Sequence, residues 1–275
     1  MKKFFRILCI LLTFLCLIFS MTGCLKYQKI TSGDFVYVPK DESRAVLYSL
    51  SEDCIDSKKE IIIIPPYIDG KEIFAIGMQI YYSSYAKITS NAMKEVYVPY
   101  TVTALVHTSG MIRGKALEKV CFASNALFEK ESNYSPAFGF DKEISYGSSY
   151  SGEKDQKYYI TQVAYKTIQN SFESEWLETD KIFIANTSFL FNYAGSPNDD
   201  YFFINNFGYG EKINDPPYEP TREGYSFVGW YKEPECITPW DFDTDTLPEA
   251  KYNDAQEELY QETILYAKWV KENLS

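Results

Sequence analysis

Histidine is almost absent from this chain, which contains a single one, His107, among 275 residues. Catalytic systems of the Ser-His-Asp and Cys-His kinds need a histidine to activate their nucleophile, and no nucleophile motif lies near His107. Zinc sites built from histidine and cysteine lack ligands at close spacing for the same reason. We therefore expect His107 to be structural, and the sequence predicts no catalytic residue and no metal ligand.

Acidic residues are plentiful, but none of them forms a recognisable site motif. Residues 241–245 begin like a calcium-binding loop, yet an EF-hand needs Gly at its sixth position and Glu at its twelfth, where this chain has Thr246 and Tyr252. Paired carboxylates of a glycoside hydrolase stay open at this point, because their separation is invisible in a sequence. Glycine-rich phosphate loops and dinucleotide fingerprints are missing, so we expect no cofactor.

Positive charge is also scarce, with 27 Lys and Arg against 38 Asp and Glu and a formal net charge of −11. Lys2, Lys3 and Arg6 all belong to the first few residues, so the rest of the chain is more acidic still. Affinity for phosphate backbones depends on Lys and Arg, and an acidic surface repels polyanions. We therefore expect no nucleic-acid partner.

The apolar run at residues 7–19 is too short for a helix that spans a bilayer, which takes about 20 apolar residues. It follows a basic opening and precedes Met21, Thr22, Gly23 and Cys24. A basic start, a short apolar run and small residues after it are typical of a secretory signal peptide.

Residues 21–24 resemble the bacterial lipobox, with Met21 at the position where Leu is usual. The resemblance implies cleavage before Cys24 and attachment of a diacylglyceryl group to this residue, and two or more acyl chains hold a protein stably at a membrane. We therefore predict a lipoprotein signal peptide at 1–23, a lipid-anchored tether at 24–33 and a location on the outward-facing side of a bacterial cell envelope. The alternative is an ordinary signal peptide followed by a chance cysteine.

Few cysteines remain beyond this anchor. Cys54, Cys121 and Cys236 cannot all pair within one chain, because their number is odd. One disulfide with a spare thiol is open, but their apolar neighbours favour buried free cysteines.

Aromatic residues make up 17% of the chain, and this palette favours sheet-rich folding. A surface that stacks on sugars is one use for them, and an ordinary core is the commoner one. We expect Tyr225, Trp230, Trp240 and Trp269 to belong to a core.

A degenerate repeat runs through the middle of the chain. Its members are short apolar stretches at residues 61–65, 95–99, 119–123 and 181–185, with a weaker one at 157–161. Two of the steps between them are 24 residues long, which is a leucine-rich-repeat period. In such arrays each strand stacks on its neighbours in a parallel sheet, because one repeat alone cannot bury its apolar face.

With the stretch at 68–77, this pattern resembles the BspA-type leucine-rich repeat of bacterial surface proteins, although most repeats lack the family's Ala-Phe pair and two steps are too long. The resemblance implies a solenoid of about four to five turns over residues 34–198. We expect residues 34–37 and 45–48 to form an opening hairpin and residues 186–198 to cap the other end.

The last quarter carries the most specific signal. Residues 220–231 place a turn before alternating apolar and polar positions, and residues 263–269 alternate in the same way. Together they resemble the internalin-type B-repeat of bacterial surface proteins, which implies a small β-grasp-like domain at 199–275. Its boundary is expected in the turn-rich cluster at 196–200, so close that the two domains touch. An acidic insertion at 249–261 is expected to form a short helix or a loop.

The sequence thus predicts a mainly β protein with minor α content, in which a short leucine-rich-repeat solenoid precedes a β-grasp-like domain. Its expected function is non-catalytic: a lipid-anchored surface protein, held to the membrane through Cys24, that binds an extracellular protein or glycan through its repeat surface. A structural spacer between membrane and cell wall is the alternative. An enzyme is the third reading, and it would need a pocket with paired carboxylates.

Overall fold

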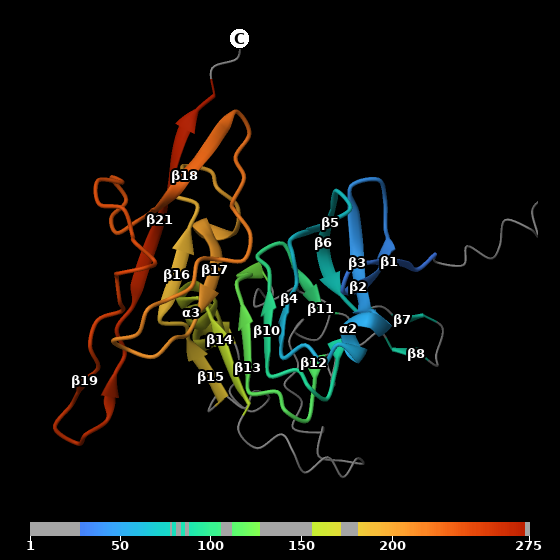
Figure 1. Ribbon diagram of the computed structural model, residues 1–275, viewed down its shortest axis with the longest axis horizontal. Coiled ribbons are helices and arrows are strands. Elements are labelled where there is room, and N and C mark those ends of the chain that lie inside the picture. Colours follow the sequence, from blue (N-terminus) through green and yellow to red (C-terminus); the bar gives the residue numbers. More distant parts are fainter. Residues whose placement is uncertain are drawn as a thin grey trace, which may run out of the picture.

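A computed structural model gives the fold of the chain (Figure 1). The structure describes residues 28–77, 79–80, 84–85, 88–105, 112–126, 156–171 and 181–272. The predicted signal peptide, Cys24 and His107 lie outside these residues. Strands dominate the described part, and its helical segments are short, which confirms the mainly β prediction. These segments are Glu52–Asp56 for α2, Gln162–Ser171 for α3 and the 3-10 turn Asn198–Asp200 for η5.

The five repeat strands form one parallel sheet in the order of the sequence, β4-β10-β13-β14-β15. Their bounds are Ile61–Ile63 for β4, Glu95–Val98 for β10, Lys119–Phe122 for β13, Lys157–Ile160 for β14 and Ile182–Ile184 for β15. Equivalent repeat positions are paired, since Val96 lies between Ile62 and Val120. The predicted strand positions and their parallel stacking are therefore confirmed.

The segments that return between these strands form further parallel pairs. One set is β3, β6 and β11, and the other is β9 and β12, so the first repeats have strands on three sides. Their bounds are Arg44–Leu50 for β3, Lys71–Ile76 for β6, Ala104–Leu105 for β11, Ile88–Thr89 for β9 and Ile112–Arg113 for β12. Between β14 and β15 the return contains the helix α3.

Alternate residues of the strands point between the two sheets and build the core of the repeat region, because successive side chains of a strand face opposite sides. Val96 and Val120 of the parallel sheet are fully buried there, and Leu47 of β3 and Ile73 of β6 meet them from the second sheet. Ile168 of α3 belongs to the same core.

The predicted opening hairpin is confirmed. Strand β2 (Phe35–Pro39) pairs antiparallel with β3, and β1 (Ile30–Ser32) pairs with β2 at the edge. Asp69 and Gly70, both with positive φ, form the tight turn between β5 (Tyr67–Ile68) and β6. The short strands β7 (Gln79–Ile80) and β8 (Ser84–Tyr85) pair antiparallel.

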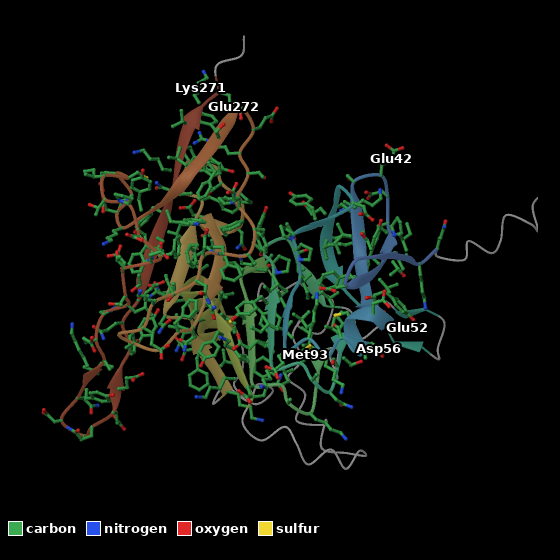
Figure 2. All side chains as sticks on the ribbon, viewed as in Figure 1. Glu42, Glu52, Asp56, Met93, Lys271 and Glu272 are labelled. Carbon is green, nitrogen blue, oxygen red and sulfur yellow. The ribbon has the colours of Figure 1, made fainter. Side chains whose placement is uncertain are left out.

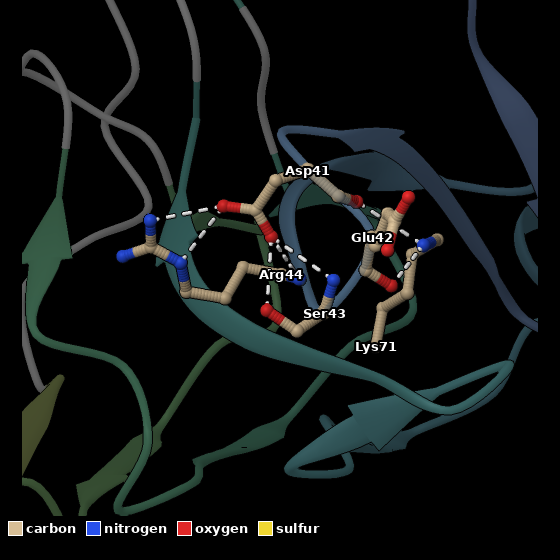
Figure 3. A network of polar contacts seen from close by, with 5 residues as sticks. All are labelled: Asp41, Glu42, Ser43, Arg44 and Lys71. Atoms are coloured by element: carbon tan, nitrogen blue, oxygen red, sulfur yellow. Dashed lines mark hydrogen bonds and ion pairs between the residues drawn. The ribbon is translucent and has the colours of Figure 1, made fainter.

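Figure 3 shows how the turn between β2 and β3 is held. The Lys71 ammonium donates to the backbone carbonyls of Asp41 and Glu42, at 3.1 and 2.6 Å. The Asp41 carboxylate accepts the backbone N–H groups of Ser43 and Arg44 and pairs with the Arg44 guanidinium at 2.9 Å. Burial alone would raise the pKa of Asp41, but the hydrogen bonds from Ser43 and Arg44 outweigh it and lower the pKa to about 2.

This turn predicts a pH-dependent effect of Asp41→Asn. A carboxyl whose pKa is lower in the folded state stabilises the fold above its ordinary pKa of 3.8, and this stabilisation is lost as the pH falls toward 2. We therefore expect the Tm difference between wild type and Asp41→Asn to be largest above about pH 4 and to vanish below about pH 2. Glu42→Gln, at the tip of the same turn, controls for the change in net charge. A difference that stays constant from pH 5 to about pH 2 would contradict the prediction.

The last part of the chain forms a second, four-stranded sheet in the order β17-β16-β21-β18. The bounds are Thr187–Leu190 for β16, Tyr201–Asn205 for β17, Tyr225–Tyr231 for β18 and Thr263–Lys271 for β21. The predicted alternation is confirmed, because Phe227 and Leu265 face the core while Val228 is exposed.

Two expectations for this region are corrected. The segment expected to cap the solenoid, 186–198, contributes an inner strand, β16, which pairs with β17 and β21. The predicted boundary at residue 199 thus falls between two strands of the terminal sheet. The insertion at 249–261 is neither a helix nor a plain loop: β19 (Lys251–Tyr252) pairs antiparallel with β20 (Glu258–Leu259). Asn253 makes this hairpin, because its side chain accepts two backbone N–H groups of the turn.

Figure 1 shows the parallel sheet at the centre, with the opening sheet on one side and the terminal sheet on the other. Within the described ranges, none of the helices has the length and apolarity needed to cross a bilayer.

Candidate interaction surface

The outer face of the parallel sheet is the surface through which the sequence predicts binding, but the middle of this face is buried. Tyr97, Cys121 and Tyr159 point outward from β10, β13 and β14 and are only 6%, 2% and 9% exposed. They share a hydrophobic core with the terminal sheet, and Tyr97 stacks on Phe203 of β17 with ring centroids 5.4 Å apart. The predicted contact between the two domains is thus a common core, and it closes part of the predicted binding surface.

A polar network lies within this junction. The Asn205 side-chain oxygen accepts hydrogen bonds from the Tyr97 hydroxyl and the Lys119 ammonium, both at 3.1 Å. Lys119 also pairs with Glu95 at 2.8 Å, so its charge is compensated where it is largely covered. Every polar group named here has a partner, which is typical of a structural network.

A second polar cluster joins the modules at the η5 turn. Asn198 accepts the backbone N–H of Asn125 at 2.7 Å and donates to the carbonyls of Ala123 and Tyr201 at 2.7 and 2.8 Å. Asn198, Asp199 and Asp200 all have positive φ, at 56°, 50° and 77°. The turn is therefore held in a left-handed conformation by contacts to the residues that follow β13.

The cysteines beyond the predicted anchor are free. Cys54 and Cys121 are buried, as expected, while Cys236 is half-buried. Burial raises the pKa of the Cys121 thiol to about 12 and also raises the pKa values of Cys54 and Cys236. A thiol with a raised pKa is a poorer nucleophile at neutral pH, because less of it is present as thiolate.

Three of the four aromatic residues expected in the core of the terminal region, Trp230, Trp240 and Trp269, lie in or against it, while Tyr225 is partly buried outside this cluster. Trp230 is buried. The partly buried Phe227 packs against Trp230, and the partly buried Trp269 packs against Phe227. Tyr225 and Trp240 are also partly buried, and the Arg222 guanidinium lies 3.7 Å from the ring centroid of Tyr225.

In the acidic loop at 241–245, the carboxylates accept hydrogen bonds from backbone N–H groups of the same loop. Asp241 accepts the N–H of Asp243, and Asp245 accepts the N–H of Asp241, both at 2.9 Å. Backbone hydrogen bonding from Asp243 lowers the pKa of Asp241, and bonding from Asp241 and Lys232 lowers that of Asp245. Across the residues that the structure describes, no group of three or more His, Cys, Asp or Glu is placed to hold a metal ion.

The most exposed apolar grouping in one short element is the insertion hairpin, which we define as residues 249–261. Tyr252, Leu259 and Tyr260 are 56%, 44% and 46% exposed. Single exposed apolar residues elsewhere, such as Ile237 and Val270, need no explanation, but three within one hairpin do. The sequence identified this insertion as acidic and tyrosine-bearing, but it did not predict a hairpin.

The insertion hairpin is fixed at both ends. At the tip, Asn253 accepts the N–H groups of Ala255 and Glu257 at 2.9 Å each, and its amide donates to the Glu257 carboxylate at 2.8 Å. At the root, the Tyr209 hydroxyl exchanges hydrogen bonds with the backbone of Gln261, and the Tyr260 hydroxyl donates to the carbonyl of Ala185 at 3.0 Å. The exposed side chains between these ends are therefore displayed on an ordered backbone.

The terminal sheet coincides with a known repeat. Residues 189–268, which begin in β16 and end in β21, match the model of the Listeria-Bacteroides repeat domain. This match covers less than a third of the chain.

Three relatives share short segments with the chain. It is 39% identical over 61 residues to a protein of Evansella cellulosilytica named as a membrane protein, which covers 22% of this chain and 7% of that protein. A protein of the same organism named as a Gly-rich membrane protein is 38% identical over 61 residues, or 22% of this chain and 6% of its own length. Internalin H of Listeria monocytogenes is 49% identical over 41 residues, or 15% of this chain and 7% of its own length. The chain thus spans less than a tenth of these relatives, and the likenesses support a bacterial surface-associated protein with a module similar to the Listeria-Bacteroides repeat domain.

Proposed function

We propose that this chain is a lipid-anchored, non-catalytic protein of a bacterial cell surface that binds an extracellular protein or glycan. The observation that carries the proposal is the likeness of residues 189–268 to the Listeria-Bacteroides repeat domain. Relatives named as membrane proteins and as an internalin support a place in the envelope. The basic, apolar and small-residue pattern before Cys24 supports the lipid anchor.

The finer fold assignment is part of the same proposal. The parallel, sequence-ordered strands support a degenerate leucine-rich-repeat array, and the four-stranded terminal sheet supports a β-grasp-like module. Because β17 covers the middle of the outer repeat face, we assign binding to the surfaces that stay open, above all those of the terminal module.

A spacer between membrane and wall is the second candidate, and the shared core favours it. Tyr97, Cys121 and Tyr159 of the solenoid pack in one cluster with the terminal sheet. A large apolar contact of this kind restrains the relative motion of two domains. A rigid unit anchored near one end would keep a fixed distance from the membrane.

The test of location is protease treatment of intact cells that express the wild type or Cys24→Ala. We expect the wild type to be cell-bound and removed by the protease, and Cys24→Ala to appear in the medium, because the lipid is its anchor. Cys236→Ala, which changes a half-buried thiol far along the chain, serves as the matched control and should behave like the wild type.

Two other outcomes would change the assignment. Cys24→Ala that remains cell-bound would overturn the lipid anchor. Wild type that is protected on intact cells would overturn outward display and favour the spacer.

A further inference from the structure

The insertion hairpin is rich in uncompensated negative charge. It carries Glu249, Asp254, Glu257 and Glu258 against a single lysine, Lys251. Among the residues that the structure describes, none of the ion pairs involves these carboxylates. Charges left unpaired around exposed apolar side chains favour a partner of the opposite sign.

The two kinds of side chain are interleaved on the hairpin. Tyr252 lies directly opposite Glu258 in the register, so an aromatic ring and a carboxylate share one face. Leu259 lies opposite Lys251 on the other face. A lysine or arginine could lay its aliphatic stem against Tyr252 and place its charge at Glu258, which combines apolar contact, cation–π attraction and an ion pair.

The order of the hairpin favours binding as well. An isolated two-stranded hairpin is marginally stable in water, yet this one is fixed by the Asn253 turn at its tip and by Tyr209 and Tyr260 at its root. A surface that is already ordered loses less conformational entropy when a partner docks.

The charge decides between occupants. A second copy of this chain carries a net charge of −11, so its overall field repels the hairpin. Anionic wall polymers and anionic lipid headgroups are repelled for the same reason. A neutral glycan could stack on Tyr252 and donate hydroxyl hydrogen bonds to the carboxylates, but it would bring no positive charge to compensate theirs. A polypeptide segment rich in Lys and Arg satisfies both the tyrosine and the carboxylates.

We propose that the insertion hairpin docks a Lys- and Arg-rich segment of an extracellular partner protein. The proposal rests on the proposed surface-binding function and names the site and the chemistry of the partner within it.

The test measures binding of a fluorescent octalysine peptide to the full chain in mild detergent at low salt. We expect Asp254→Lys/Glu258→Lys to weaken binding by about tenfold or more, because it reverses two charges beside Tyr252. Glu42→Lys/Asp56→Lys makes the same change in net charge on the opposite side of the molecule (Figure 2) and should weaken binding less than about twofold. Tyr252→Ser, which leaves the charge unchanged, should weaken it by about threefold or more.

Several results would overturn the proposal. If the two charge variants weakened binding equally, net charge alone would explain the effect. If Tyr252→Ser bound octalysine as well as the wild type, the aromatic ring would have no role in binding. Tyr252-dependent binding of a neutral oligosaccharide without octalysine binding would assign the hairpin to a glycan. Self-association that the hairpin variants abolish would assign it to a second copy.

The experiment is independent of the Cys24 test. If display on cells depends on Cys24 while the hairpin variants bind octalysine like the wild type, the surface function stands and the hairpin proposal alone fails. If the hairpin binds as expected but the wild type is protected on intact cells, outward display alone fails.

Discussion

Phe203→Ala is expected to lower the free energy of unfolding by about 4 kcal/mol, because removal of a buried phenylalanine loses its apolar contacts and leaves a cavity. Phe203 lies on β17 and is 6% exposed. Its ring contacts Tyr97 of the solenoid as well as Phe189 and Tyr218 of the terminal module, with centroid distances of 5.4, 6.0 and 6.1 Å. The substitution therefore removes contacts on both sides of the shared core.

The same variant tests whether the two modules unfold together. Cys54 is buried in the solenoid and Cys236 is half-buried in the terminal module, so thiol labelling reports on each separately. If the two modules unfold as one cooperative unit, Phe203→Ala should lower the free energy of opening at Cys54 and at Cys236 by the same amount. Faster labelling of Cys236 alone would show that the modules unfold independently.

Phe183→Ala is the matched control. Phe183 lies on β15, the last strand of the parallel sheet, and is 39% exposed. It contacts Tyr159 at 5.8 Å but takes no part in the contact with β17. Since little buried area is lost, we expect a cost of only about 1 kcal/mol.

The repeat strands could be located from the sequence because their signal is local. Each contains a short apolar run, two of the four steps between the runs are 24 residues long, and neighbours in a repeat array pair in sequence order. Strand β16 could not be placed in this way. Thr187 pairs with Thr263 across most of the terminal module, and nothing local in Thr187–Leu190 distinguishes this partner from the adjacent solenoid.

The burial of the outer face of the repeat sheet has a signal in the sequence. Val96, Tyr97 and Val98 are all apolar in sequence, as are Val120, Cys121 and Phe122. Near-continuous apolar runs are typical of parallel strands that are buried on both faces, whereas an open face would alternate with polar residues. Such runs predict a cover on the sheet without identifying it, and only the fold shows that the cover is β17.

The candidate site was predictable in position but not in form. The extra residues at 249–261 stood out by their charge and their tyrosines. Strands of two residues lie below the length at which alternation can be recognised, so the hairpin depends on the Asn253 turn and on root contacts from Tyr209 and Ala185. Those root contacts are long-range and leave no mark in the local sequence.

Asn198→Ala should destabilise the junction by about 3 kcal/mol through two separable effects. The first is the loss of hydrogen bonds, because the side chain satisfies the buried N–H of Asn125 and the carbonyls of Ala123 and Tyr201. The second is backbone strain, because alanine at a φ of 56° meets the steric cost of the left-handed region, which asparagine tolerates better.

Asn198→Gly separates these effects. Glycine loses the same hydrogen bonds but adopts positive φ freely, so it should be about 1 kcal/mol more stable than the alanine variant and still well below the wild type. Denaturant unfolding gives the three free energies, and amide exchange at Asn125 reports the bond itself. Equal stabilities of the alanine and glycine variants would exclude backbone strain as a cause of the destabilisation. An amide exchange rate at Asn125 equal to that of the wild type in both variants would exclude the hydrogen bond as a cause. If both results were obtained, the apolar core alone would hold the junction. The left-handed turn would then be a consequence of the position of β17, and it would not help to fix that position.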